Sequence, residues 1–447
     1  MDDVSKRIAA LSPAKRALLQ QKLREKSSAA QTSTVTQKRL RGPALLQERP
    51  ERLPLSYAQQ RLWFLDKLEG SSAEYNIREA LRLKGQLDFT ALERAVDAVI
   101  ERHESLRTRF IEEDGEPLQV IEPVVHLPVV IEDLSELDPA ERERETGAAL
   151  RAEAQKPFDL GRGSLLRIRL LKLDEREHVL LSTFHHIIFD GWSIAVFNRD
   201  LSALYEAFLR GGEGNPLKPL EVQYPDYALW QRERLEGEEL ERQLAYWKNQ
   251  LSDAPALALP TDLPRPLRPT FAGARHFVIL PPESTSKLKE LSRQENATLF
   301  MTLLAAFQIL LSRYSGEQDI SVGIPAVNRN HLELEDLIGF FLDTLVLRTD
   351  LSGGPSFREL LRRVQKVTLD AYAHADVPFE RLVQELHPER SLNQTPLFQA
   401  FLNFLSFEDE PVRLSGLVAE RCLKEGLKSK FDLTLYIREG DYGLYLS

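Results

Sequence analysis

Residues 185–193 read His-His-Ile-Ile-Phe-Asp-Gly-Trp-Ser and lie where a predicted strand gives way to a predicted helix. Residues 179–184 before them form a nearly continuous apolar run, which predicts a central strand buried on both faces. Further upstream, residues 166–173 alternate in polarity and predict a half-buried strand. Apolar residues then recur with helical spacing from Ile194 to Phe208, and this pattern stops at Gly211. Catalytic side chains often occupy such loops, because the rigid elements around them hold them in place.

The residue types in this loop suit proton transfer. On an extended backbone His185 and His186 point to opposite faces, so only one of them can face a given cavity. A neutral imidazole can take a proton from an attacking amine or hydroxyl, or stabilise the charge that develops on it. Asp190 either orients an imidazole or holds the loop through a salt bridge, and Gly191 permits a positive φ and a close backbone approach. We predict no metal site, because adjacent histidines diverge and no Cys/His cluster accompanies them.

The composition limits the class of protein. The chain has 447 residues, of which 43% are apolar, so it is long enough for two or three domains or for one domain with two lobes. Its one cysteine, Cys422, fits a cytoplasmic location, and no run resembles a membrane span or a signal peptide. The net charge is −10, but residues 1–53 carry +7 and the remainder −17. An acidic body argues against nucleic acid as a substrate.

Four segments follow from the sequence. Residues 1–53 predict a short amphipathic helix and a basic flexible linker. Residues 54–250 form the predicted first lobe, which carries the histidine pair. Residues 251–270 contain five prolines, which exclude helix and central strand and predict a linker between lobes. Residues 271–447 form the predicted second lobe, and because they end in strand-like sequence we expect the chain to be part of a longer protein.

The loop at 185–193 resembles the active-site motif His-His-x-x-x-Asp-Gly of the condensation domains of nonribosomal peptide synthetases. Six further stretches resemble the other motifs of that family, in the family's order: residues 55–65, 102–110, 224–230, 338–345, 374–380 and 390–397. Two positions depart from the pattern, since Asp343 stands where asparagine is usual and Ala375 where glutamine is usual. An extra carboxylate at Asp343 would favour a cationic or hydroxylated donor group nearby.

The resemblance implies an α/β fold (an α+β sandwich) with two chloramphenicol-acetyltransferase-like lobes in a V-shaped pseudo-dimer and an active-site tunnel between them. It implies amide-bond formation between a donor acyl or peptidyl thioester and the amine of an acceptor aminoacyl thioester. The domain would bind no cofactor itself, because both substrates are tethered to the 4′-phosphopantetheine of carrier proteins. The implied partners are donor and acceptor carrier domains and an adenylation domain, with an upstream polyketide synthase module as a further candidate through the leader. Neither nucleic acid nor a membrane is expected.

The resemblance also implies roles for particular residues. His186 faces the tunnel and acts on the amine, either as a base or by stabilising its charge. His185, Asp190 and Gly191 complete the active loop, and Arg329 is the match to the second-lobe arginine that pairs with the motif aspartate. Support of the active site is expected from Arg329, Arg61, Arg102, Trp192 and Ser193, and the tunnel is expected to include Asp343 and Tyr224.

Other members of the fold differ by motif. An epimerisation domain usually has Val-Ser-Trp after Asp-Gly, and a heterocyclisation domain has aspartates in place of the two histidines. A non-catalytic recruiting platform and a stand-alone HxxxD acyltransferase remain as alternatives, although the platform usually lacks the second histidine and the acyltransferase would not predict the other six motifs. Residues 57–63, Tyr-Ala-Gln-Gln-Arg-Leu-Trp, resemble domains whose donor ends in an L-residue, with a polyketide-derived donor as the alternative.

Overall fold

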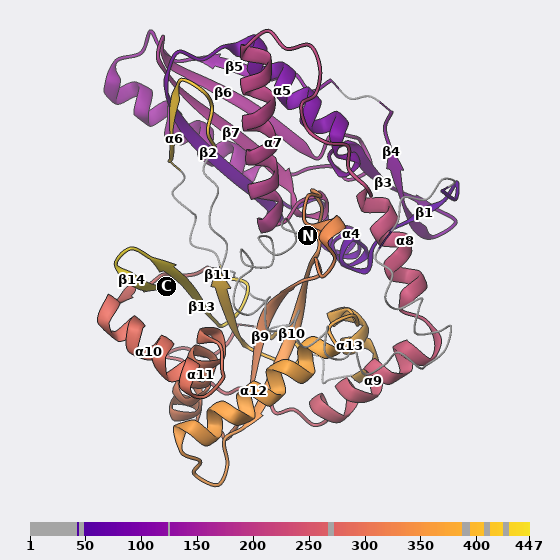
Figure 1. Ribbon diagram of the computed structural model, residues 1–447, viewed down its shortest axis with the longest axis vertical. Coiled ribbons are helices and arrows are strands. Elements are labelled where there is room, and N and C mark those ends of the chain that lie inside the picture. The colour runs from indigo at the N-terminus through magenta and orange to yellow at the C-terminus, as the bar shows by residue number, and fades with distance from the viewer. Residues whose placement is uncertain are drawn as a thin grey trace, which may run out of the picture.

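The computed structural model describes residues 43, 49–123, 126–266, 272–386, 394–405, 412–422 and 429–447. The predictions of a leader helix and its linker, and parts of the inter-lobe linker and of the motif at 390–397, fall on residues outside these ranges. The described elements form two lobes, the first in violet and magenta above the second in orange and yellow (Figure 1). The expected two-lobed α/β architecture is therefore confirmed.

The first lobe is built on a five-stranded sheet whose central strand leads to the histidine pair. In sheet order its strands are β12 (Leu417–Arg421), β2 (Asn76–Gly85), β7 (Glu177–His185), β6 (Leu166–Asp174) and β5 (Val130–Asp133). Every residue of β7 after the first is buried, and β6 alternates as predicted. Helices α5 (Phe89–Arg102) and α7 (Gly191–Leu209) cover one face of the sheet, and α6 (Pro139–Gln155) covers the other (Figure 1). A small sheet of β1 (Leu53–Pro54), β4 (Glu116–Ile121) and β3 (Thr108–Glu113) lies beside it.

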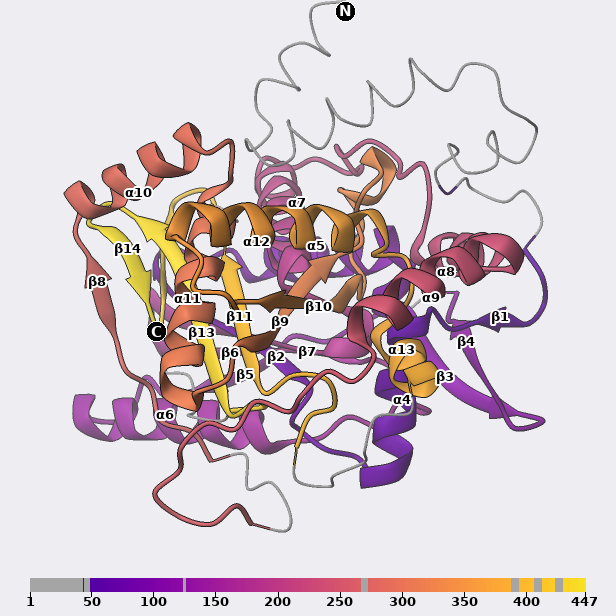
Figure 2. The same cartoon turned by 90° about the horizontal axis from the view of Figure 1, so that it is seen from below.

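The second lobe has a six-stranded sheet. Its order is β10 (Leu342–Asp350), β9 (Asp319–Val327), β11 (Ala400–Leu405), β13 (Leu433–Gly440), β14 (Gly443–Leu446) and β8 (Val278–Leu280). Helices α10 (Pro282–Gln294), α11 (Leu299–Ser315) and α12 (Phe357–Ala373) lie on the side turned away from the first lobe (Figure 1 and Figure 2). Thr298 caps α11 through its side chain, and Gly316 ends it with a left-handed φ of 79°.

The lobe boundaries differ from the prediction at two places. Helices α8 (Tyr224–Arg234) and α9 (Gly237–Leu251) were both expected in the first lobe, but Leu244, Trp247 and Leu251 of α9 pack in the core of the second. Strand β12, from the sequence of the second lobe, pairs antiparallel with β2 of the first. An apolar stripe or a strand pattern predicts that a segment is buried but does not tell which core receives it.

Two further pairs of elements connect the lobes. Helix α4 (Tyr57–Glu69) of the first lobe faces α13 (Phe379–Leu386) of the second. The segment between β9 and β10, which includes the short helix η3 (Leu332–Leu334), reaches the start of α7. Among the described residues no single helix is long and apolar enough to cross a membrane, and only the pair α10 and α11, bent by 104°, passes that test when taken together.

Candidate active site between the two lobes

His185 is the last residue of β7 and is buried. Its Nδ1 accepts a hydrogen bond from the backbone N–H of Ile187 at 3.1 Å, and its ring lies edge-on to Phe158 at 6.1 Å. Burial, and then the adjacent His186, lower the pKa of His185 to about 3. The His185 ring is therefore neutral and engaged inside the first lobe, which suits support of the loop.

His186 begins the short helix η2 (His186–Ile188) and is only half-buried. Its Nδ1 lies 2.7 Å from the carbonyl oxygen of Phe189, and because a carbonyl only accepts, Nδ1 carries the proton. The other nitrogen, Nε2, then has a free lone pair. Burial, and then the charge of Lys430, lower the pKa of His186, so the ring is neutral at neutral pH. The ring of Phe340, from the second lobe, lies 4.6 Å away.

Asp190 caps the N-terminus of α7. Its Oδ1 accepts hydrogen bonds from the backbone N–H and the hydroxyl of Ser193, both at 2.8 Å. Its Oδ2 accepts from the backbone N–H of Phe341 in the second lobe at 3.1 Å. Arg329 completes the set with an Nη2 that is 3.2 Å from Oδ1. The expected ion pair between Asp190 and Arg329 is therefore present, and it joins the lobes directly behind the histidine loop.

Arg329 is buried, and it contacts other groups in addition to Asp190. Its Nη1 donates to the carbonyl oxygens of Leu334 at 2.6 Å and Leu337 at 2.7 Å, and its guanidinium stacks over Phe341 at 3.9 Å. Burial lowers the pKa of Arg329, and Asp190 opposes that effect. The guanidinium thus fixes the fold of the segment that follows β9 as well as its attachment to α7.

Of the three residues that follow Asp190, Trp192 and Ser193 contact the second lobe. Trp192 donates from Nε1 to the carbonyl of Glu335 at 2.9 Å, and Ser193 Oγ accepts from the N–H of Gly339 at 3.1 Å, so both bind the second lobe. The expectation for Gly191 is wrong. Its φ is not positive, and no atom lies within 4 Å of where a Cβ would be. The close approach occurs instead at Gly339, where a Cβ would lie 2.0 Å from the ring of Tyr224.

Arg102 belongs to a buried network behind the loop. Its Nε lies 3.0 Å from Asp200 of α7, and His103 Nε2 lies 2.9 Å from the same carboxylate. His103 Nδ1 accepts from the backbone N–H of Ile338 at 3.3 Å, which identifies Nε2 as the donor to Asp200. This network links α5, α7 and the second lobe. The sequence did not single out Asp200, although its spacing on the helix of the motif places it on the buried face.

Arg61 and Asp343 lie together at the contact between α4 and α13. Arg61 Nε is 2.9 Å from Glu380, an ion pair across the lobes. Asp343 is buried and accepts from the backbone N–H of Phe379 at 3.3 Å. Burial, and then the carboxylate of Glu380, raise the pKa of Asp343 to about 7. The uncharged form of Asp343 is therefore populated near neutral pH, and in that form it resembles the neutral asparagine that is usual at this position.

Tyr224 occupies a position that differs from the expected tunnel wall. It is 1% exposed, its hydroxyl donates to the carbonyl of Phe340, and it pairs with Ser56 Oγ at 2.8 Å. A side chain so enclosed holds the lobes together and has no surface to offer to a substrate.

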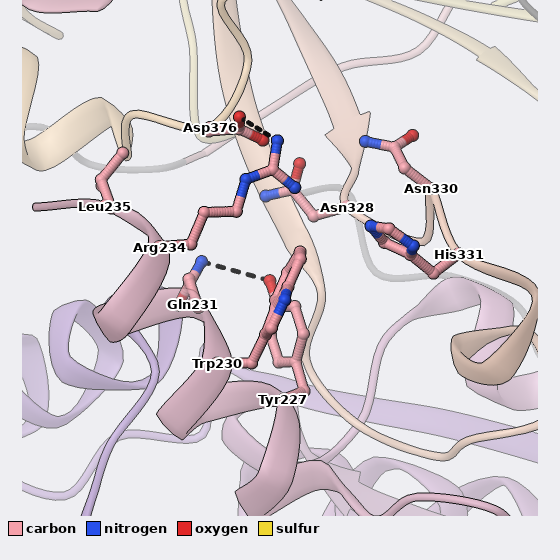
Figure 3. A pocket seen from close by; sticks show the side chains of 9 residues that line it. All are labelled: Tyr227, Trp230, Gln231, Arg234, Leu235, Asn328, Asn330, His331 and Asp376. Carbon is pink, nitrogen blue, oxygen red and sulfur yellow. Dashed lines mark hydrogen bonds and ion pairs between the residues drawn. The ribbon is translucent and has the colours of Figure 1, made fainter. Parts of the chain in front are cut away.

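A small polar cavity lies between α8 and the second lobe, as Figure 3 shows. Arg234 forms an ion pair with Asp376 there at 2.7 Å, and Gln231 donates to the hydroxyl of Tyr227 at 3.1 Å. Its charged groups are paired with each other, so the cavity adds no unpaired charge to the site. In the described ranges no group of three or more His, Cys, Asp or Glu side chains could hold a metal ion.

Two lobes join around a neutral histidine, and similarity to known proteins assigns this arrangement to the acyltransferase class. The family model described as "Condensation domain" matches residues 50–447, and the chain belongs to that family. Condensation domains of nonribosomal peptide synthetases form amide bonds between thioester-tethered substrates, and this is the reaction of the class to which the chain belongs.

Similar proteins among characterised ones agree with this family assignment. One of the subunits of the linear gramicidin synthase of Brevibacillus parabrevis is 53% identical over 403 residues, which are 89% of this chain and 8% of that protein. Phosphinothricin tripeptide synthetase PhsC from Streptomyces viridochromogenes is 41% identical over 456 residues, which cover all of this chain and 40% of that protein. The chain thus spans a small part of the relatives that it matches.

Solved structures have the same fold. The X-domain in its complex with OxyB from teicoplanin biosynthesis superposes with a TM-score of 0.80 at 31% identity, over 91% of this chain and 89% of that one. The first condensation domain of the CDA synthetase superposes with a TM-score of 0.68 at 23% identity, over 89% of this chain and 92% of that one, which supports the fold alone.

Proposed function

We propose that this chain joins a donor acyl or peptidyl group to an acceptor aminoacyl group, with His186 as the residue that acts on the acceptor amine. Each substrate is a thioester on the 4′-phosphopantetheine of a carrier domain, and the two arms enter the space between the lobes from opposite sides. The proposed partners are these carriers and an adenylation domain of the same synthetase. A polyketide module upstream is the alternative source of the donor, and the cytoplasm is the proposed location.

The reaction requires attack by the acceptor amine and departure of the donor thiolate. The amine nitrogen attacks the thioester carbonyl carbon, a C–N bond forms, and the C–S bond breaks. The amine loses a proton and the departing thiolate gains one, so the products are an amide and a free phosphopantetheine thiol. Because the thioester is already activated, holding both reactants in place contributes much of the acceleration.

The observation that carries the proposal is the hydrogen bond between His186 Nδ1 and the carbonyl of Phe189. It leaves Nε2 as an acceptor on the half-buried side of a neutral ring. Such a nitrogen can accept a hydrogen bond from the attacking amine or take its proton. His185, Asp190 and Arg329 have supporting roles in the proposal, because His185 Nδ1, both Asp190 oxygens and both terminal nitrogens of Arg329 are hydrogen-bonded within the protein.

His186→Ala should lower the rate of condensation by about 10²–10⁴, the usual range for a positioned acid–base group. The assay uses purified chain with donor and acceptor carriers loaded with matched thioesters, and mass spectrometry detects the product on the acceptor carrier. His126→Ala is the matched control, because His126 is an exposed histidine of the same lobe. Wild-type turnover by a folded His186→Ala protein would remove His186 from the mechanism.

A non-catalytic platform is the second candidate. The structural neighbour with a TM-score of 0.80 is an X-domain in a complex with OxyB, so a chain of this fold can bind a partner protein. The same assay separates the two candidates. A platform would leave both loaded carriers unchanged, whereas a condensation domain would transfer the donor to the acceptor.

A further inference from the structure

Lys430 is held in a fixed place beside β13 of the second lobe. Ser429 on one side donates from Oγ to the carbonyl of Phe431 at 2.7 Å. On the other side, the ring of Phe431 stacks on Phe401 at 4.6 Å, and Asp432 accepts from Arg265 at 2.7 Å. Phe431 and Asp432 therefore anchor the backbone that follows Lys430.

The side chain of Lys430 reaches the first lobe next to His186. Its Nζ lies 4.6 Å from the centre of the Tyr75 ring, a cation–π contact between the lobes. The carbonyl of Tyr75 accepts from the backbone N–H of His186 at 2.8 Å. Tyr75 thus connects the two residues, since its ring contacts Lys430 of the second lobe and its carbonyl binds His186 of the first lobe.

The groups around this pair are mostly engaged elsewhere. Arg61 and Glu74 are the charged groups that act on Lys430, and Asp190 and His185 are those of the active loop near His186. Arg61 is paired with Glu380, which faces Asp343, and Asp190 is paired with Arg329. Among the described residues, Lys430 is the charged group that lowers the pKa of His186, whereas Asp190 raises it and Glu74 raises the pKa of Lys430.

Both groups keep contact with solvent although the protein lies close to them. Lys430 is exposed and His186 half-buried, so solvent reaches both. Loss of hydration nevertheless lowers both pKa values, that of Lys430 to about 8, and for His186 the charge of Lys430 is the next cause.

We propose that Lys430 is a positioning residue of the condensation reaction, whose positive charge keeps His186 and the incoming acceptor amine in their neutral forms. The inference rests on the proposed function. An α-amine has an ordinary pKa of about 8, so much of it is protonated at neutral pH and unable to attack. A fixed cation nearby disfavours a second positive charge, which increases the fraction of free amine and leaves Nε2 of His186 without a proton.

The test compares the pH–rate profiles of the wild type, Lys430→Met and Lys430→Arg in the condensation assay. We expect Lys430→Met to move the acidic limb upward by about half a pH unit, so that the rate on that limb falls about threefold while the plateau changes less than about twofold. Lys430→Arg should keep the wild-type profile. Lys287→Met, at an exposed lysine of α10, is the matched control.

A second measurement is independent of turnover. NMR titration of the histidines, with His186→Ala used to assign the His186 signal, should give a higher His186 pKa in Lys430→Met than in the wild type. If both the His186 titration and the acidic limb stay unchanged in Lys430→Met, the inference is wrong. A uniform loss of rate at every pH would also overturn it, because that result indicates a structural contact. Absence of condensation by the wild type would instead contradict the proposed function.

Discussion

The ion pair between Asp190 and Arg329 offers the sharpest test of how the lobes hold the active loop. Asp190→Ala removes the acceptor for four donor groups and leaves a buried guanidinium without its counter-charge. Breaking a buried pair from one side costs about 3–5 kcal/mol, and a lost helix cap costs about 1 kcal/mol. For a lobe of this size the melting temperature should fall on the order of 10 °C.

Asp138→Ala is the matched control for this experiment. Asp138 caps α6 through the N–H groups of Ala140 and Glu141, but it is exposed and has no buried arginine. Its loss should therefore cost only the cap, about 1 kcal/mol. The difference between the two variants in urea and thermal unfolding measures the buried charge together with the bonds from Phe341 and the Ser193 hydroxyl.

A double-mutant cycle completes the test. Arg329→Met alone should destabilise as strongly as Asp190→Ala, whereas the double variant should lose less than the sum, because it buries no unpaired charge. Condensation activity is measured on the same proteins below their melting temperatures. If Asp190→Ala abolished activity with an unchanged melting temperature, our structural role for Asp190 would be refuted, and direct participation in the chemistry would replace it.

Two further predictions concern the donor and the acidic contact of the lobes. A donor thioester that ends in an L-residue should condense about 100-fold faster than its D-epimer on the same carrier, because an offset of about 1 Å at the reacting carbon is enough for that loss; equal rates would overturn the donor assignment. Asp343 has a folded pKa of about 7 against an ordinary 3.8, so it binds more protons when folded, and stability falls as pH rises between these values. Asp343→Asn should therefore raise the melting temperature above that of the wild type by several degrees more at pH 8 than near pH 5, and an equal effect at both pH values would contradict the assigned pKa.

Local patterns predicted the elements that carry the site. An apolar run predicted β7, and helical spacing predicted α7. Both predictions succeeded because the buried residues of each element follow a regular local pattern in the sequence. The positions of α9 and β12 could not be predicted in this way. Each is buried against a lobe that its place in the sequence does not indicate, and only the folded arrangement decides between two apolar surfaces.

The candidate site was predictable to a similar degree. The motif indicated His186 and Asp190, and the resemblance indicated Arg329, whose pairing the structure contains. The sequence did not indicate the Phe189 carbonyl or Lys430, since a backbone acceptor has no residue signature and Lys430 is separated from His186 by most of the chain. The expectation for Gly191 failed because a glycine permits a positive φ or a close approach without requiring either.

Strand β12 also affects the order in which the protein is completed during translation. Residues 417–421 pair with residues 81–85 of β2, so the first sheet keeps an open edge until about 330 more residues have been made. At a usual rate of synthesis of about 5–20 residues per second, this interval lasts on the order of half a minute. An unpaired strand edge readily joins other chains. The nascent first lobe is therefore exposed to misassembly for most of the synthesis of the chain. Slower translation would lengthen this period, and neighbouring ribosomes on the same message would bring other nascent chains close to the open edge.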